Sequence, residues 1–206
     1  MARYGKRNSA KFVFTKELGI LIGVIVALIV ATILLSIPNR TERQIEKYNE
    51  AITEFNTQNS TSYATITSDE TVYVDVELDE VADILNEKGT VYVLYGTLSI
   101  DTIVSNFVTI QTEAENREIE KIYFVTSEYV DSFVDDEEDE HDEDIYEAQV
   151  KEYAEVFNAN IAEGIEEVDL YNSGALFVYK DGQLVFNSTS YTDYNWTVII
   201  NQAFQK

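Results

Sequence analysis

A run of 20 residues without any charge, LGILIGVIVALIVATILLSI from Leu18 to Ile37, places the strongest constraint on this chain. At about 1.5 Å per residue, a helix of that length matches the hydrocarbon core of a bilayer. The run is apolar on every face, which disfavours a core helix that buries only one side. It is longer than the apolar core of a cleaved signal peptide and lacks a small-residue cleavage site. We therefore expect an uncleaved transmembrane helix at 18–37.

The segments on the two sides of this run carry opposite charge. Residues 1–17 contain five basic residues and one acid, whereas the remaining chain contains nine basic and 37 acidic residues. Because basic flanks stay on the cytoplasmic side, we expect 1–17 in the cytoplasm and the C-terminal part outside the cell. The expected location is the cell membrane, crossed once, with lipid as one partner. A net charge of -24 disfavours nucleic acid as a partner, since its phosphates would be repelled.

Two residue types with reactive side chains are almost missing. Cysteine is absent, and histidine occurs once, as His141. This excludes disulfides, thiol redox chemistry and thiolate metal sites, and it leaves little material for histidine-based catalysis. No position pattern singles out a pair of carboxylates, and Ser99 in GTLSI lacks the surroundings of a hydrolase nucleophile. We therefore expect a protein that is not an enzyme, with no catalytic residue, metal or cofactor.

An acidic run, DDEEDEHDED at 135–144, carries nine acids in ten residues. It lacks the glycine and the ligand spacing of a calcium-binding loop. The simpler interpretation is a solvated insertion between two regular elements. The alternative function for the whole chain is an acidic surface module that interacts with cations or cationic partners through 135–144.

Residues 38–70 are expected to form a juxtamembrane helix followed by a linker. Four apolar residues recur at 3-4-3 spacing and define one helical face: Ile45, Tyr48, Ile52 and Phe55. Such a face suits a helix that lies on its own domain or on the lipid surface, and a short coiled-coil seam is the other option. The following segment, 56–69, is polar, rich in Ser and Thr and without period, as in a linker.

From Thr71 onward, short strands and helices alternate. Strands are expected at 71–76, 90–96 and 120–127, and a hairpin around Lys180-Asp181-Gly182. Helices are expected over ELDEVADILNEKG, after Ser99, around Tyr153 and from Asp193 to Phe204. The order β-α-β-α-β-α-β-β-α predicts an α/β domain with a mixed sheet over 71–206.

Two segments of this domain resemble the thioredoxin family, and the resemblance covers Thr71 to Gln205. VYVLYGTLSIDTIVSNF is similar to the family's central strand, its W-C-x-x-C motif and its first long helix. GALFVYKDGQLVF is similar to the family's cis-proline, apolar strand, Lys-Asn/Asp-Gly turn and next strand. The chain looks most like small thioredoxin-like proteins of Gram-positive bacteria, including bacteriocin accessory proteins. The resemblance implies a thioredoxin-like three-layer α/β/α sandwich with a mixed sheet, preceded by one N-terminal transmembrane helix and a juxtamembrane helix.

The reactive residues of that family are replaced here. The alignment puts Ser99 and Thr102 at the two cysteine positions and Gly174 at the cis-proline position. A serine hydroxyl can neither act as a thiolate nor form a disulfide, so we expect Ser99 to cap the helix instead. The resemblance implies a binding groove at five degenerate positions: Tyr95, Ser99, Thr102, Ser173 and Gly174. It implies a non-enzymatic, membrane-anchored adaptor or accessory subunit of an envelope, secretion or transport complex, with a membrane or cell-envelope protein as partner.

Overall fold

The computed structural model describes residues 40–77, 80–126, 150–170, 174–191 and 195–205. The expected transmembrane helix at 18–37, the acidic run at 135–144 and Ser173 lie outside these residues. Among the residues described, no helix is both long enough and apolar enough to cross a bilayer. The larger compact unit of the chain begins at Thr41 and contains all the elements below except the first residue of α2.

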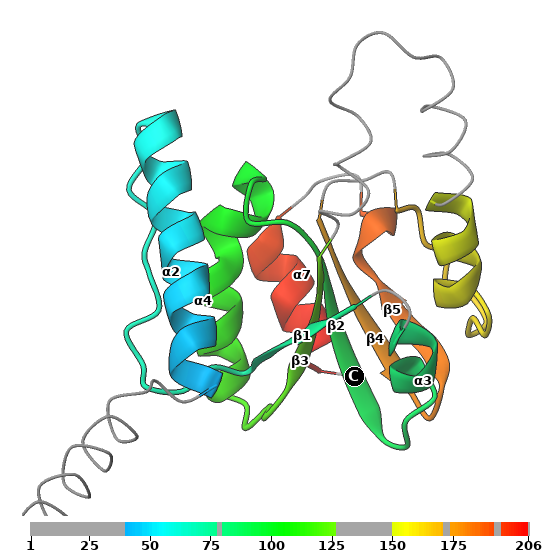
Figure 1. The fold of residues 1–206 in the computed structure, drawn as a ribbon. Helices are drawn as coiled ribbons and strands as arrows, with labels where there is room; N and C mark the ends of the chain where they lie inside the picture. The colour runs from blue at the N-terminus through cyan, green and yellow to red at the C-terminus, as the bar shows by residue number, and fades with distance from the viewer. Residues whose placement is uncertain (1–39, 78–79, 127–149, 171–173, 192–194, 206) are drawn as a thin grey trace, which may run out of the picture. The chain divides into compact units, whose positions relative to one another are not determined.

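Five strands in the described residues form one mixed sheet in the order β1-β3-β2-β4-β5 (Figure 1). Three of them are parallel: β1 (Tyr73–Val76), β3 (Ile122–Thr126) and β2 (Thr90–Gly96). The other two, β4 (Ala175–Lys180) and β5 (Gln183–Asn187), continue the sheet in antiparallel pairing. The α/β class and the mixed sheet predicted from the sequence are confirmed.

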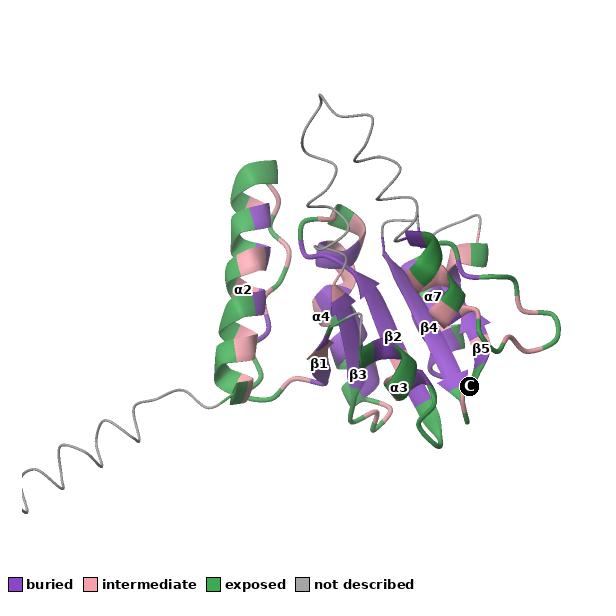
Figure 2. Ribbon diagram, turned by 45° about the vertical axis from the view of Figure 1, so that its right-hand side comes forward, coloured by how far each residue is buried: buried purple, intermediate pink, exposed green. Residues whose placement is uncertain are grey.

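Helices cover both faces of this sheet (Figures 1 and 2). On one face lie α2 (Arg40–Asn59), α4 (Asp101–Glu115) and α7 (Trp196–Ala203). On the other lie α3 (Val81–Leu85) and a helix at 150–157. A short 3-10 helix, η2 (Ser188–Ser190), follows β5.

The central strand β2 is buried by both helical layers. Its Leu94 belongs to the apolar cluster beneath α4, whereas Val93 and Tyr95 belong to the cluster beneath the helix at 150–157. A strand buried on both faces needs apolar residues at consecutive positions, which explains the continuous run TVYVLYG. Figure 2 shows the strands as the most deeply buried part of the domain.

The turn between β4 and β5 has the geometry that its sequence predicts. Asp181 and Gly182 have φ angles of 50° and 80°, and a two-residue type I′ turn requires positive φ at both positions. The Asp181 amide donates to the carbonyl of Gly89 at 2.8 Å, and the Gly89 amide donates to Asp181 Oδ1 at 2.9 Å. These two bonds tie the hairpin to the loop that precedes β2.

An aromatic cluster attaches α2 to the sheet. The Tyr48 ring packs edge-on against Tyr73, Phe107 and Phe124, with ring centroids 5.9, 5.1 and 6.0 Å away. Its hydroxyl donates to Asp75 Oδ1 on β1 at 2.5 Å. Burial, followed by this bond, raises the pKa of Tyr48 well above its ordinary value. The apolar face of α2 therefore lies on its own domain, one of the two arrangements expected for it.

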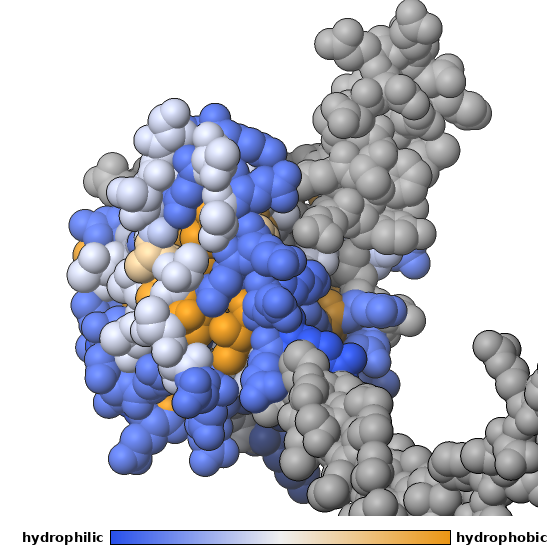
Figure 3. All heavy atoms as spheres, turned by 60° about the vertical axis from the view of Figure 1, so that its left-hand side comes forward, coloured by the Kyte–Doolittle hydropathy of each residue, from blue (hydrophilic) through white to orange (hydrophobic). Residues whose placement is uncertain are grey.

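Two asparagine side chains hold the segment after α2 against that helix. Asn49 donates from Nδ2 to the carbonyl of Ile66 at 2.9 Å and accepts from the Ile66 amide at 2.7 Å. Asn56 makes the same pair of bonds with Tyr63, at 2.9 and 2.8 Å. Residues 63 and 66 thus run back along α2. Figure 3, turned toward the α2 side, shows a pale surface of intermediate hydropathy beside a small exposed hydrophobic area.

Replacing Tyr48 by alanine should loosen α2 from the sheet. Tyr48 has no exposed surface, and deleting a buried aromatic ring costs about 3–5 kcal/mol of the free energy of unfolding. Denaturant titration of the full chain in detergent, followed by the fluorescence of Trp196, measures this loss. The control Glu50→Ala removes an exposed side chain of the same helix and should change stability by less than about 0.5 kcal/mol. Equal stability of the two variants would contradict the packing of α2.

Candidate functional site

The end of the sheet where β2 stops and β4 begins is closed by one isoleucine. Gly96 and Gly174 have φ angles of +147° and +104°, which non-glycine residues rarely adopt. A Cβ on Gly174 would lie 2.6 Å from Ile103 Cδ1, and a Cβ on Gly96 would lie 2.8 Å from Ile103 Cγ1. A Cβ on Gly96 would also lie 3.2 Å from the Cα of Gly174. Ile103, in the first turn of α4, therefore fills the space that side chains at both positions would need.

A threonine hydroxyl organises the loop between β2 and α4. Thr97 is 2% exposed, and its Oγ1 accepts from the Ser99 amide at 3.3 Å and lies 3.1 Å from Ser99 Oγ. The helix begins at Asp101 with Ile100 as its N-cap, and no side chain is hydrogen-bonded at that cap. The prediction that Ser99 caps the helix is wrong. The turn organised by Thr97 places Ser99 one residue before the cap and engages its hydroxyl elsewhere.

The residues expected to line a groove lie on both faces of the sheet. Ser99 is exposed in the loop, Thr102 is half-buried in the first turn of α4, and Gly174 is buried at the start of β4. Tyr95 points to the opposite face, where its ring packs edge-on against Phe157 with a centroid distance of 6.1 Å. The structure therefore brings Ser99, Thr102 and Gly174 to one end of α4 and separates the Tyr95 ring from them.

The polar groups of this loop are bonded to one another rather than arranged for proton transfer. Asp101 accepts a hydrogen bond from Tyr63 Oη at 2.7 Å, and this bond is the main cause of a raised pKa of Tyr63. A carboxylate in the first turn also complements the positive end of the α4 dipole. A serine nucleophile needs an adjacent base, and in the described part of the chain the hydroxyl partner of Ser99 is Thr97.

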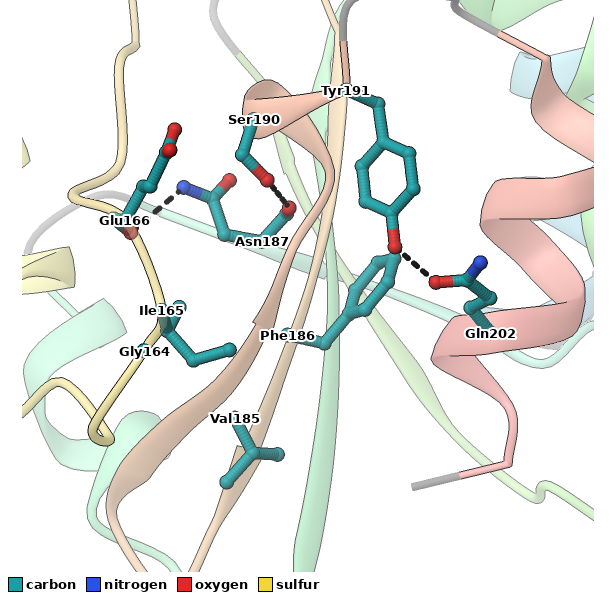
Figure 4. Close-up of a pocket in the computed structure, with 9 residues that line it drawn as sticks. All are labelled: Gly164, Ile165, Glu166, Val185, Phe186, Asn187, Ser190, Tyr191 and Gln202. Carbon is teal, nitrogen blue, oxygen red and sulfur yellow. Dashed lines mark hydrogen bonds between the residues drawn. The ribbon is translucent and has the colours of Figure 1, made fainter.

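A second depression lies beside the edge strand β5 (Figure 4). Its volume is about 270 Å³, and it is lined by nine residues: Gly164, Ile165, Glu166, Val185, Phe186, Asn187, Ser190, Tyr191 and Gln202. Asn187 donates from Nδ2 to the carbonyl of Glu166 at 3.1 Å, and Tyr191 donates to Gln202 at the other side. Glu166 is the one carboxylate among the lining residues, whereas hydrolysis commonly uses a pair. The depression is therefore lined by polar and apolar side chains together and contains no pair of carboxylates.

The part of the chain that the structure describes contains no cluster of side chains arranged to bind a metal ion. Within residues 40–77, 80–126, 150–170, 174–191 and 195–205, no group of three or more Asp, Glu or His side chains could hold a metal ion. The acidic run at 135–144 lies outside these ranges.

Comparison with known proteins gives no family for the chain. No protein-family model matches the sequence, and no curated protein matches it.

Adding a single methyl group at Gly174 should disturb the closed end of the sheet. Gly174→Ala should lower the free energy of unfolding by about 2 kcal/mol, because it combines a strained φ with a clash against Ile103. Gly164→Ala is the control, since Gly164 has a φ of +82° but nothing within 4 Å of its added Cβ. Thermal unfolding of the full chain in detergent measures the loss of stability in Gly174→Ala and in Gly164→Ala.

The double variant Gly174→Ala/Ile103→Ala separates the clash from the backbone strain. Its destabilisation should be smaller than the sum of the two single variants, because the clash needs both side chains. The close packing is ruled out if Gly174→Ala costs no more than Gly164→Ala.

Proposed function

We propose that this chain is a membrane-anchored, non-enzymatic adaptor or accessory subunit built on a thioredoxin-like domain. Its setting is an envelope, secretion or transport complex. The observation that carries the proposal is the arrangement at the start of α4. The resemblance aligns Ser99 and Thr102 with the family's redox pair, and in the structure Ile103, which follows Thr102, covers both Gly96 and Gly174.

The order and direction of the strands support the thioredoxin-like part of this proposal. The family places its reactive pair between the central strand and the first long helix, with the cis-proline segment beside that pair. Here β2 is the central strand of the order β1-β3-β2-β4-β5 and leads through Ser99 into α4. Gly174, which precedes β4, lies beside the end of β2. This order of segments supports the proposal of a thioredoxin-like domain that lacks the reactive residues.

The chemistry of the replaced residues supports a binding role. The family's reaction needs a thiolate at the positive end of a helix, and a hydroxyl is far too weak an acid to supply one. The hydroxyls of Ser99 and Thr97 lie within hydrogen-bond distance of each other. A surface that keeps the fold of a redox protein without its thiols can still hold a partner segment.

The charge pattern supports the anchored part of the proposal. An uncharged run of 20 residues separates the basic segment 1–17 from a strongly acidic remainder. Protease added to intact cells or spheroplasts should therefore remove 39–206 and spare 1–17, as followed by tags at both ends. Protection of the C-terminal part in sealed cells would reverse the assigned orientation.

Crosslinking in native membranes tests the adaptor function. A photoreactive amino acid at Ser99 should give a discrete heavier product, since a partner would contact the exposed loop before α4. The control position is Glu120, which is exposed just before β3, at the opposite end of the strands. Products from both positions alike, or none from Ser99, would count against the proposal. A Ser99 product that disappears when 135–144 is deleted would favour the acidic module instead.

Restoring two cysteines tests the alignment on which the proposal depends. Ser99→Cys/Thr102→Cys should oxidise to an intramolecular disulfide, and the first thiol should have a pKa below that of a free cysteine. Exchange with a partner thiol should stay poor, because Gly174 still occupies the cis-proline position.

A matched pair in the same helix provides the control for this variant. Thr109→Cys/Thr112→Cys has the same spacing on exposed positions of α4 but lies away from its N-terminus. Its thiols should show an ordinary pKa in alkylation rates measured against pH. If the Ser99/Thr102 pair forms no disulfide under oxidising conditions, the alignment of YGTLSIDT with the family motif is wrong.

A further inference from the structure

A groove of about 400 Å³ lies between α3 and the helix at 150–157, on the face of the sheet opposite α4. One wall is formed by Ala82 and Leu85, which stand three positions apart on α3. The other wall is formed by Glu152, Glu155 and Val156 of the helix at 150–157 and by Ala159 in the turn that follows it. The groove is thus bounded by two elements of regular structure, and it is separate from the loop that contains Ser99.

The floor of this groove is apolar and held in place. Tyr179 of β4 and Leu85 of α3 line it and are 1% and 4% exposed. The Tyr179 hydroxyl donates to the carbonyl of Phe157 at 2.7 Å, which fixes the orientation of the ring. Little of these two side chains is exposed, so the apolar surface that a ligand can reach in the groove comes from Ala82, Val156 and Ala159, which lie above this buried floor.

The rim of the groove carries two exposed carboxylates. Glu152 and Glu155 stand three positions apart on one helix, so their Cβ atoms are about 5–6 Å from each other. The ion pairs within the described residues are Lys47–Asp75 and Arg117–Glu113, and neither involves these two acids. Lys151 is exposed on the same helix but is not among the residues that line the groove.

We propose that this groove docks a lysine or arginine side chain, flanked by apolar residues, from an extended segment of a partner protein. This inference rests on the proposed adaptor function and names the chemistry of its partner. A long basic side chain can lay its methylene stem on Ala82, Val156 and Ala159 and keep its charge beside Glu152 and Glu155. The volume suits one such side chain with part of a neighbouring residue.

The charge of the chain favours the same partner. After residue 17 the chain carries 37 acidic and nine basic residues, so its field attracts cationic segments and repels acidic ones. Long-range attraction alone would not direct a cationic segment to one particular surface. An apolar groove beside two carboxylates selects a side chain that has an apolar stem and a positive charge at its end.

A peptide titration of the full chain in detergent micelles tests this proposal. The probe is a short peptide of alternating leucine and arginine, and the control peptide has glutamate in place of arginine. NMR shifts should be concentrated at Ala82, Leu85, Val156 and Ala159 with the arginine peptide only. Glu152→Gln/Glu155→Gln should weaken its binding by about fivefold, the weight of two exposed ion pairs.

Two further variants separate the groove from general attraction. Glu46→Gln/Glu50→Gln removes the same charge from exposed positions of α2 on the other face of the sheet and should leave the affinity nearly unchanged. Ala159→Trp fills the groove from an exposed wall position, keeps both carboxylates and should abolish the localised shifts.

Several results would overturn the proposal. If Glu152→Gln/Glu155→Gln and Glu46→Gln/Glu50→Gln weaken the affinity for the arginine peptide equally, the binding depends only on net charge. NMR shifts that persist in Ala159→Trp would place the peptide outside the groove. Absence of binding by the arginine peptide would remove the groove as a docking site. If the Ser99 crosslink survives any of these results, the adaptor function stands and only the groove assignment fails. If that crosslink is also lost, both fail.

Discussion

The contact of Ile103 with the bare backbones of Gly96 and Gly174 determines what this end of the domain can do. It joins the last residue of β2, the residue before β4 and the first turn of α4. Because a Cβ at either glycine would lie within 2.8 Å of the isoleucine side chain, a larger residue at either position would require Ile103 to shift. Hydrocarbon therefore occupies the space between the end of β2, the residue before β4 and the first turn of α4.

Outside the sheet, asparagine side chains pair with the backbone amides and carbonyls of irregular segments, as neighbouring strands do within the sheet. Asn49 and Asn56 each bond to both the amide and the carbonyl of one residue in the segment that returns along α2. Asn158 repeats the arrangement with Val168, at 3.2 Å and 2.7 Å. Irregular backbone packed against a core needs such partners, because unpaired amides and carbonyls are costly once water is excluded. These bonds explain how segments without periodicity keep a defined path.

The parts of the fold that the sequence predicted are those with strong periodicity or specific turn chemistry. β2 is apolar throughout since both of its faces are buried, and Asp181-Gly182 supplies the positive φ angles of the hairpin. The prediction that Ser99 caps α4 failed, because the neighbouring Thr97 hydroxyl accepts from the Ser99 amide and sets a turn that puts Ile100 at the cap. The groove beside Glu152 was also missed. Its walls come from α3 and from 150–157, and only the tertiary fold brings these together.

Methyl NOE spectroscopy of the full chain in detergent micelles tests the closed end of the sheet most directly. It reports which protons lie near the δ1 methyl group of Ile103. The packing described here predicts strong cross-peaks from that methyl group to the α protons of both Gly96 and Gly174, and protection from a soluble paramagnetic probe. Absence of both cross-peaks, together with an Ile103 methyl group accessible to the probe, would reveal an open site and contradict the packing of Ile103 over the two glycines.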